Sequence, residues 1–325
     1  MNAMERPATA VPAAPFSVLA LDIGGTKVAG AVLRYEDRAT TPSVALRRSI
    51  PTDAQRGGAA VLRGVVELAA ALVEESPERP VGIGVGTAGC VDEAQGSIAY
   101  ANDLMPGWTG QPVARALSER TGLPVSVVND VRAHALGEVR WGTGRGASPC
   151  LVIAAGTGLG CTTVVDGRIV GGGKGFAGEI GYTRNPLRGA ADDDAAPTLE
   201  DVASGSGIVA CYERATGIRI DGSEISQRAA AGEEAARQVI EQAGFALGLA
   251  LSVWTNLLDP ARVIVSGSVT KAGALWRKAL LRGLSGNVAP VLADLPLADA
   301  QLGGDAPLFG AAERFLDARA EMAGA

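Results

Sequence analysis

Histidine is almost absent from this 325-residue chain, and aromatic residues make up only 4% of it. The single histidine, His134, lies in the helical pattern VRAHALGEVR, where a packed or solvated helix position is expected rather than a metal ligand or a base. Cysteine is scarce and unpaired in sequence, because no CxxC occurs among Cys90, Cys150, Cys161 and Cys211. Such usage favours reduced thiols over disulfides or a metal knuckle. The expected compartment is therefore the cytoplasm.

Long apolar runs and clusters of positive charge are missing as well. No uninterrupted apolar run reaches the roughly 18 to 20 residues of a membrane span. The first residues, MNAMERPATAVPAAP, lack the apolar core of a signal peptide. A net charge of −6 without any Lys/Arg cluster disfavours a nucleic-acid surface, which needs a basic face. We expect neither a membrane nor a nucleic-acid partner, so any phosphate would be bound locally by backbone amides, a metal ion or one lysine.

What the chain does contain is an alternation of β-branched runs with helical patterns, which is typical of an α/β protein. Strands are expected over residues 18–22, 28–33, 43–50, 81–86, 125–128, 150–154, 161–165 and 263–265. Helices are expected over residues 59–75, 111–121, 132–140, 233–258, 271–284 and 309–322. The helix over 233–258 is apolar on nearly all sides after Ala243, which predicts burial between layers. The length of the chain favours two domains.

Two stretches of the sequence share one design. VLALDIGGTKVAGAVL and, about 130 residues later, CLVIAAGTGLGCTTVVDG each read as a strand, a Gly/Thr-rich turn and a second strand in place of a helix. Two copies of this unit predict a duplicated architecture with a cleft between its halves.

The first turn combines a carboxylate, two glycines, a hydroxyl and an ammonium group: Asp22, Gly24, Gly25, Thr26 and Lys27. Glycine lets the backbone approach a ligand closely and expose its amides, which is how polyphosphate is commonly held. The lysine would add a point charge, the threonine a donor, and the aspartate could hold a hydrated Mg²⁺ near the phosphates. The pattern therefore indicates a nucleotide-phosphate loop.

An ordinary tight hairpin is the alternative interpretation of this turn, since Gly-Gly is common there. The second copy at Gly156, Thr157 and Gly158 favours phosphate binding. Other glycine motifs do not compete. GVGTAG, at residues 84–89, runs into CVDEAQGSIAY where a dinucleotide site requires a helix, and no GxxxxGK[ST] occurs.

Eight motifs carry a resemblance to a known family: DIGGTK, GVGTAGCVD, PGW, VVNDVRAHALGE, GTGLG, GFAGEIG, LEDVASG and VSGSV. Their order and approximate spacing, from residue 18 to about residue 312, resemble those of the ROK sugar kinases of the actin-like ATPase superfamily. The resemblance implies a duplicated actin-like ATPase (ribonuclease H-like) fold with two lobes around a central cleft. It places a smaller lobe at 1–129, rejoined by the C-terminal helix over 306–325, and a larger lobe at 130–305. A homodimer is possible.

The resemblance also implies an activity, the transfer of the ATP γ-phosphoryl group to a sugar hydroxyl with Mg²⁺. The family's base, the Asp of an Asn-Asp pair, falls on Asp130. The chemistry is reasonable independently, because a carboxylate within hydrogen-bond reach can orient the attacking hydroxyl and take its proton. Asn129 or Asp130 could also cap the helix that follows, and the two roles are compatible.

Sugar and nucleotide contacts are implied residue by residue. The sugar contacts fall on Asn102, Asn129, Asp130, Glu179 and Glu200. Because NDLMPGW is two residues longer than the family's usual NLPGW, Asp103 is the alternative to Asn102. The nucleotide side includes Gly267 and Ser268, whose small side chains would let adenosine approach.

Two departures from the family pattern fall near the sugar. Where the family reads GEIGH followed by a zinc cluster CxCGxxGC, this chain reads GEIGYTRNPLRGAADDDAAPTLE. Tyr182 replaces the histidine, and no cysteine lies between Cys161 and Cys211, so no zinc is expected. The acidic run at 192–194 is expected to be solvated. The loop over 187–197 would be ordered by packing or mobile. Glucose is the default substrate, with N-acetylmannosamine, N-acetylglucosamine or allose as alternatives.

Two non-enzymatic functions are alternatives. A ROK-type repressor is disfavoured, since only residues up to Ser17 precede the first expected strand and a DNA-binding unit needs several helices. A sugar sensor without catalysis stays open. A pure binder has no evident need for Asp22, Lys27, Asp130 and Glu179 together, so an ATP-dependent sugar kinase is favoured.

Overall fold

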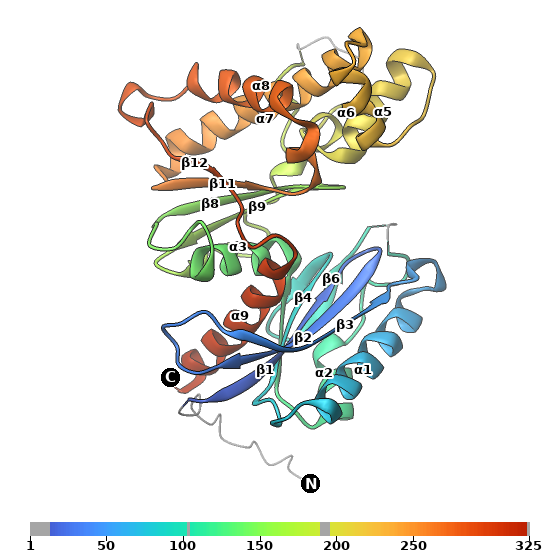
Figure 1. Cartoon of the computed structure of the whole chain (residues 1–325), viewed down its shortest axis with the longest axis vertical. Coiled ribbons are helices and arrows are strands. Elements are labelled where there is room, and N and C mark those ends of the chain that lie inside the picture. The colour runs from blue at the N-terminus through green and yellow to red at the C-terminus, as the bar shows by residue number, and fades with distance from the viewer. Residues whose placement is uncertain (1–13, 103–104, 189–195, 324–325) are drawn as a thin grey trace. The chain divides into compact units, whose positions relative to one another are not determined.

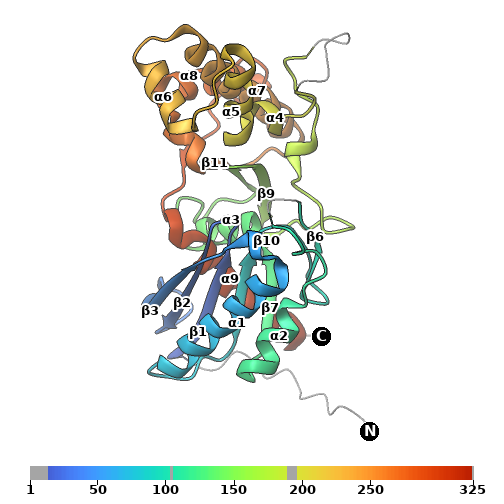
Figure 2. The same cartoon turned by 90° about the vertical axis from the view of Figure 1, so that its right-hand side faces the viewer.

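The computed structural model describes residues 14–102, 105–188 and 196–323. The chain forms two compact units, shown in Figures 1 and 2. Unit 1 contains Met1–Arg145 and Leu302–Ala325, and unit 2 contains Gly146–Gln301. Among the described residues, no helix has both the length and the apolar character that a membrane span requires.

Unit 1 is built on a five-stranded sheet with the strand order β3-β2-β1-β4-β7. The strands are β1 (Phe16–Ile23), β2 (Lys27–Tyr35), β3 (Ser43–Pro51), β4 (Ile83–Thr87) and β7 (Val125–Asn129). β1 and β2 form the antiparallel hairpin predicted from the sequence, whereas β4 and β7 run parallel to β1. A small ribbon of β5 (Cys90–Asp92) and β6 (Ser97–Tyr100) follows β4.

Helices cover both faces of the unit 1 sheet, as Figure 1 shows. α1 (Gly58–Glu75) and α2 (Val113–Thr121) pack on the face that carries Leu19, Leu21 and Val85. α9 (Ala306–Ala323) packs on the other face, against Val18 and Ala20, with α3 (Asp130–Trp141) beside it. The alternation of buried side chains along β1 therefore feeds two separate apolar layers, as a central strand requires.

Contact between α9 and its neighbours is backbone to backbone, and glycine makes it possible. A Cβ atom on Gly310 would lie 1.6 Å from the carbonyl oxygen of Ala133, and one on Gly137 would lie 2.1 Å from that of Ala306. Similarly, a Cβ on Gly84 of β4 would lie 2.0 Å from the carbonyl oxygen of Ala311. This packing holds α3 in unit 1, whereas the sequence-based boundary after residue 129 assigns α3 to the larger lobe.

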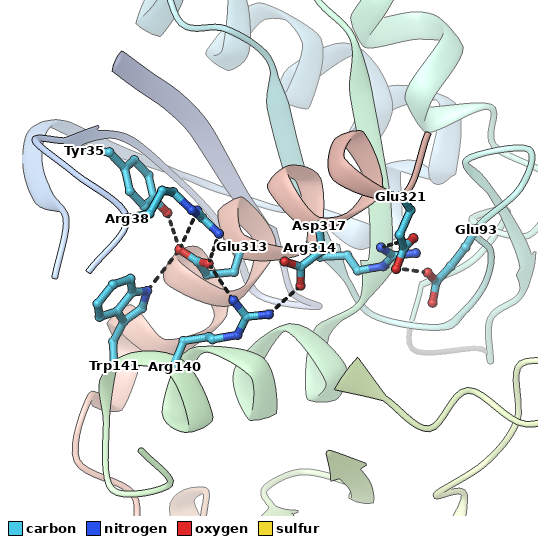
Figure 3. A network of polar contacts seen from close by, with 9 residues as sticks. All are labelled: Tyr35, Arg38, Glu93, Arg140, Trp141, Glu313, Arg314, Asp317 and Glu321. Carbon is cyan, nitrogen blue, oxygen red and sulfur yellow. Dashed lines mark hydrogen bonds and ion pairs between the residues drawn. The ribbon is translucent and has the colours of Figure 1, made fainter. Parts of the chain in front are cut away.

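A buried carboxylate fastens the same helices to the sheet (Figure 3). Glu313 of α9, whose side chain is 1% exposed, accepts hydrogen bonds from the Tyr35 hydroxyl at 2.9 Å and the Trp141 indole at 3.1 Å. Arg38 and Arg140 approach its Oε2 at 3.0 and 3.4 Å. Glu313 thereby joins the end of β2, the end of α3 and the middle of α9.

The outer part of this network runs along α9 toward β5. Arg140 also pairs with Asp317 at 2.8 Å, and Arg314 pairs with Glu93 at 3.1 Å and with Glu321 at 3.3 Å. The network fixes the position of α9 against the sheet more strictly than apolar packing alone would, because hydrogen bonds and ion pairs are directional.

Unit 2 is built on a second five-stranded sheet with the order β10-β9-β8-β11-β12. The strands are β8 (Cys150–Ala155), β9 (Leu159–Val165), β10 (Arg168–Ile169), β11 (Arg262–Ser266) and β12 (Leu297–Asp299). β8 and β9 form the second predicted antiparallel hairpin, and β11 runs parallel to β8 and β12.

Helices of unit 2 gather against one face of this sheet, as Figure 1 shows. They are α4 (Glu200–Ala203), α5 (Gly205–Thr216), α6 (Gly222–Ala230), α7 (Glu234–Leu258) and α8 (Ala274–Ser285). The sequence patterns missed α4, α5 and α6. The helix expected from residue 271 is divided, because Gly273 adopts φ 92° between a 3₁₀ turn (Ser268–Ala272) and α8.

The predicted burial of α7 holds for its middle and is wrong for its last turns. Ala243, Leu247 and Leu251 are fully buried. Val253 and Leu257 are 54% and 75% exposed, although the sequence is equally apolar there.

Candidate functional site

Polar residues of unit 1 collect where its parallel strands end. In the sheet register, Asp22 of β1 lies beside Gly86 of β4, and Thr87 lies beside Asn129 of β7. α3 begins directly at Asp130, and a Cβ on Gly86 would lie 3.9 Å from the Cα of Asp130. The carboxyl ends of parallel strands are where open α/β sheets commonly bind ligands. The sequence-predicted Asp22, Asn129 and Asp130 are thus brought together at one edge.

Asn129 is both a helix cap and a neighbour of the candidate base. Its Oδ1 accepts hydrogen bonds from the backbone amides of Val131 and Arg132 at 3.0 and 3.3 Å, which caps α3. Its Nδ2 donates to Oδ1 of Asp130 at 2.9 Å and to the carbonyl oxygen of Gly89 at 3.0 Å. Asp130 Oδ1 also accepts from the amide of Val131 at 2.9 Å. The Asp130 carboxyl is therefore oriented through one of its oxygens.

Burial raises the pKa of the Asp130 carboxyl, and the hydrogen bonds from Val131 and Asn129 oppose this effect. The pKa of Asp22 is raised further, to about 7, by burial first and by the nearby negative charge of Asp130 second. The Lys27 ammonium lowers the pKa of Asp22 without offsetting these effects. Two carboxyl groups therefore share one partly buried edge, with a single lysine near them.

We predict that Asp22→Asn stabilises unit 1 more at pH 8 than at pH 5. The folded-state pKa of Asp22 lies above its unfolded value of 3.8, so the wild-type protein loses stability as the pH rises from about 4 to about 7. An uncharged asparagine removes that loss. The gain in unfolding free energy should be greater at pH 8 by about 2 to 3 kcal/mol.

Urea denaturation at the two pH values measures this difference. Asp53→Asn is the control, because Asp53 follows β3 near the same turn but its side chain is 57% exposed. An equal gain for Asp22→Asn at both pH values would contradict the electrostatic account of Asp22.

The first glycine turn is a regular hairpin whose tip is open. The amide of Gly24 donates to the carbonyl oxygen of Lys27 at 3.0 Å, and Thr52 holds the turn from β3 through a 2.6 Å bond from its hydroxyl to the carbonyl oxygen of Gly24. A Cβ on Gly25 would meet nothing within 4 Å. Thr26 and Lys27 are exposed at the same tip. The hairpin interpretation and the phosphate interpretation are thus compatible, since the hairpin leaves room for a ligand at its tip.

Gly89 lies beside Asn129 and was not among the predicted site residues. Its φ is +93°, and a Cβ there would lie 2.8 Å from the carbonyl oxygen of Tyr100 and 3.3 Å from Cβ of Ala101. This close approach brings the segment that leads to Asn102 next to Asn129. The sequence did offer a sign of this role. Gly89 is the last glycine of GVGTAG, and it comes soon after a buried strand that no helix follows directly. Asp103 lies outside the described residues.

In unit 2, the second glycine hairpin is joined to the start of a helix. Gly156 accepts a 2.7 Å hydrogen bond at its carbonyl oxygen from the amide of Gly205, the first residue of α5. A Cβ on Gly156 would meet nothing within 4 Å, whereas one on Gly267 would lie 2.2 Å from the carbonyl oxygen of Ala155. The predicted nucleotide residues Gly156, Thr157, Gly158, Gly267 and Ser268 therefore lie around neighbouring ends of β8 and β11.

Glu200 links this hairpin to the segment that carries the other predicted sugar contacts. Its Oε2 accepts a 2.7 Å hydrogen bond from the amide of Leu159, and a Cβ on Gly181 would lie 3.2 Å from the same oxygen. Glu179 precedes the 3₁₀ turn Ile180–Tyr182, and Tyr182 is 71% exposed. Unit 2 thus brings Glu179, Tyr182 and Glu200 close to its glycine hairpin.

The donor set at the Asp22 edge fits Mg²⁺. Mg²⁺ is commonly held by one or two carboxylates together with substrate phosphates and water. Asp22, crowded by Asp130, is a carboxyl group that a divalent cation would favour in its ionised form. Within residues 14–102, 105–188 and 196–323, no group of three or more His, Cys, Asp or Glu side chains could hold a metal ion. The acidic run at 192–194 lies outside these ranges.

A separate pocket in unit 1 is not lined by any predicted site residue. Its volume is about 190 Å³, and its walls come from β2, the end of β3 and the first turns of α1. The chemistry-bearing side chains therefore lie at strand ends rather than in this pocket.

Comparisons with known proteins show the family of the chain. Residues 18–318 match the family described as "ROK family". A glucokinase of Halalkalibacterium halodurans is 31% identical over 310 residues, which cover 89% of this chain and 92% of that protein.

Two crystal structures resemble the chain over nearly its whole length. A ROK hexokinase from Thermus thermophilus has a TM-score of 0.80 and 29% identity, with 94% of this chain and 100% of that chain covered. A ROK family glucokinase from Streptomyces griseus, in complex with glucose and AMPPNP, has a TM-score of 0.72 and 28% identity, with 91% and 98% covered. The expected actin-like ATPase fold is confirmed by these likenesses.

Proposed function

Because the chain belongs to the ROK family and is an ATP-dependent sugar kinase, we propose that it phosphorylates a hexose, with Asp130 as general base. The observation that carries this proposal is the position of Asp130 at the start of α3, on the strand-end edge that it shares with Asp22. Glucose is the first candidate substrate, since proteins similar to this chain include glucokinases.

The contacts of Asp130 suit proton transfer. Asn129 and the amide of Val131 hold its Oδ1, so the carboxyl group is oriented before the sugar arrives. The attacking hydroxyl would donate a hydrogen bond to Oδ2 and lose its proton to that oxygen as its bond to the γ-phosphorus forms. The bond between the γ-phosphorus and the oxygen that bridges it to the β-phosphate would break at the same time, and ADP would leave. Phosphoryl transfer depends mainly on positioning, so an oriented carboxylate is an adequate base even though burial raises its pKa.

Phosphate binding is proposed for both glycine hairpins. In unit 1 the open tip at Gly25 is followed directly by Thr26 and Lys27, and both residues are exposed. In unit 2 the open tip at Gly156 adjoins the N-terminal end of α5, where the helix dipole favours negative charge. Gly267 and Ser268 are proposed to lie against the nucleoside.

Asp22 is proposed to hold Mg²⁺, directly or through water. When bound, the ion would neutralise charge on the β- and γ-phosphates. Asp22 itself would remain ionised beside the cation, because the positive charge offsets the burial and the repulsion that raise its pKa. No zinc is proposed for this protein.

Sugar contacts are proposed for Asn102, Asn129, Glu179, Tyr182 and Glu200. A hexose hydroxyl both donates and accepts hydrogen bonds, so carboxylate and amide side chains together suit its recognition. Tyr182, with its 71% exposed ring, replaces an imidazole and widens the range of hexoses to be tested.

Purified protein with ATP and Mg²⁺ should release ADP when given one hexose of a panel of glucose, allose, N-acetylglucosamine and N-acetylmannosamine. A turnover on the order of 1 to 100 per second is typical of such enzymes. A coupled ADP-release assay measures it, with sugar-free reactions as the control. Saturable binding of a hexose without ADP release would instead identify a sugar sensor and contradict the proposed catalytic role of Asp130.

A further inference from the structure

Residues 183–188 and 196–199 of unit 2 are joined to each other by hydrogen bonds, and we call this pair of segments the neck. Arg184 and Thr198 form an antiparallel bridge. On either side of this bridge, the amide of Leu199 donates to the carbonyl oxygen of Thr183 at 2.8 Å, and the amide of Asn185 donates to that of Pro197 at 3.0 Å. The neck begins directly after one proposed sugar ligand and ends directly before another.

Asn185 lies in the neck and is only 5% exposed. Its Nδ2 donates to the carbonyl oxygen of Ala196 at 3.1 Å, across the neck. Its Oδ1 accepts from the amide of Leu187 at 3.0 Å, and its own carbonyl oxygen accepts from the amide of Arg188 at 3.3 Å. One side chain therefore joins the outgoing strand, the returning strand and the turn that follows.

The returning segment leads directly to Glu200 and is itself held in place. Thr198 donates to the carboxylate of Asp201 from its amide at 3.0 Å and from its hydroxyl at 2.6 Å. Leu199 is fully buried. Glu200 then reaches the amide of Leu159 in the glycine hairpin. A displacement of the neck would therefore move Glu200 relative to Tyr182.

We propose that Asn185 is a positioning residue for hexose binding, which closes the neck and so fixes the spacing of Tyr182 and Glu200. The inference rests on the proposed function, because it treats these two residues as sugar ligands. Residues 183–199 contain no cysteine or histidine, so this segment offers no soft ligands for a zinc ion that could hold the neck closed. Amide hydrogen bonds close it instead. A buried amide that loses its partners leaves unsatisfied polar groups, which favours opening of the neck.

The experiment compares Asn185→Ala with the wild-type protein, using the panel hexose that the wild type phosphorylates fastest. The KM for that hexose should rise at least tenfold, whereas the KM for ATP and kcat should stay within about threefold. Trypsin should also cleave the native variant after Arg184 or Arg188 at least fivefold faster. Asn185→Asp keeps the acceptor for Leu187 but sets a carboxylate oxygen against the carbonyl oxygen of Ala196, so it should also raise the hexose KM, and it serves if the alanine variant does not fold.

Asn256→Ala is the matched control. Asn256 makes the same kind of amide clamp elsewhere in unit 2, because it donates to the carbonyl oxygen of Asn287 and accepts from the amide of Ala289, both at 2.9 Å. The control should leave the hexose KM within twofold. Equal effects of the two variants, or an unchanged hexose KM in both Asn185 variants, would overturn the inference.

A wild-type protein that turns over no hexose would contradict the proposed function rather than the role of the neck. Calorimetric binding of the same hexoses to the wild type and the Asn185 variants then decides the inference. A hexose Kd that rises at least tenfold supports it, and an unchanged Kd, or no binding to the wild type, overturns it.

Discussion

Asp130→Asn is expected to lower kcat by about 10²- to 10⁴-fold, the range by which a positioned general base accelerates a reaction. Asparagine has the same shape, and its Oδ1 can still accept from the amide of Val131 and from Asn129. The cap of α3 belongs to Asn129 and stays intact. What the substitution removes is an oxygen that can take the proton of the attacking hydroxyl.

Steady-state ADP release measures kcat, and calorimetry measures the affinity for the same hexose. The hexose Kd should change by less than about threefold, since the amide nitrogen that replaces Oδ2 can donate a hydrogen bond to the oxygen of the same hydroxyl. The melting temperature provides the control for folding. Parallel losses of affinity and turnover would make Asp130 a structural residue and contradict its role as the base.

Glu313→Ala is expected to cost about 3 to 5 kcal/mol of unfolding free energy, the typical loss when one member of a buried ion pair is removed. The substitution leaves Arg140 and the hydroxyl of Tyr35 without the acceptor that Figure 3 shows. It also releases α9 from the end of α3. A chain of this size should then melt about 4 to 7 °C lower.

Thermal unfolding followed by circular dichroism measures this loss. Glu321→Ala is the matched control, because Glu321 also lies on α9 and pairs with Arg314 at 3.3 Å, but its side chain is 49% exposed. An exposed pair contributes about 0 to 1 kcal/mol. Melting temperatures that fall equally in the two variants would contradict the special role of the buried carboxylate.

Most strands and helices could be predicted because each carries a local pattern, whereas the short strands β5, β6, β10 and β12 were not predicted. The apolar runs on both sides of Asp22 and of Gly156 encode two hairpins, and both hairpins are present. The regular spacing of apolar residues gave α1 and α7 nearly to the residue. α5 was missed because it begins with Gly205 and Gly207, residues that the helix tolerates through a serine cap at Ser204 and close packing on α4.

The candidate site was predicted less completely, for a physical reason. A motif states which residues are available, as NDV did for Asn129 and Asp130. It does not state which distant segment approaches them, and Gly89 was missed for this reason. Apolar composition likewise does not state which segment covers a residue. Val253 and Leu257 are exposed at the end of a helix whose middle is buried.

The sequence by itself determined the α/β class, the two glycine hairpins and the carboxylates at strand ends, because each follows from residues close together in the chain. The tertiary structure alone decided that Asp130 lies near enough to Asp22 to raise its pKa, that α9 holds α3 through Glu313, and that Asn185 closes a neck between Tyr182 and Glu200. These features depend on backbone contacts between segments far apart in sequence. Local periodicity reports whether a residue is buried and does not report which residue buries it.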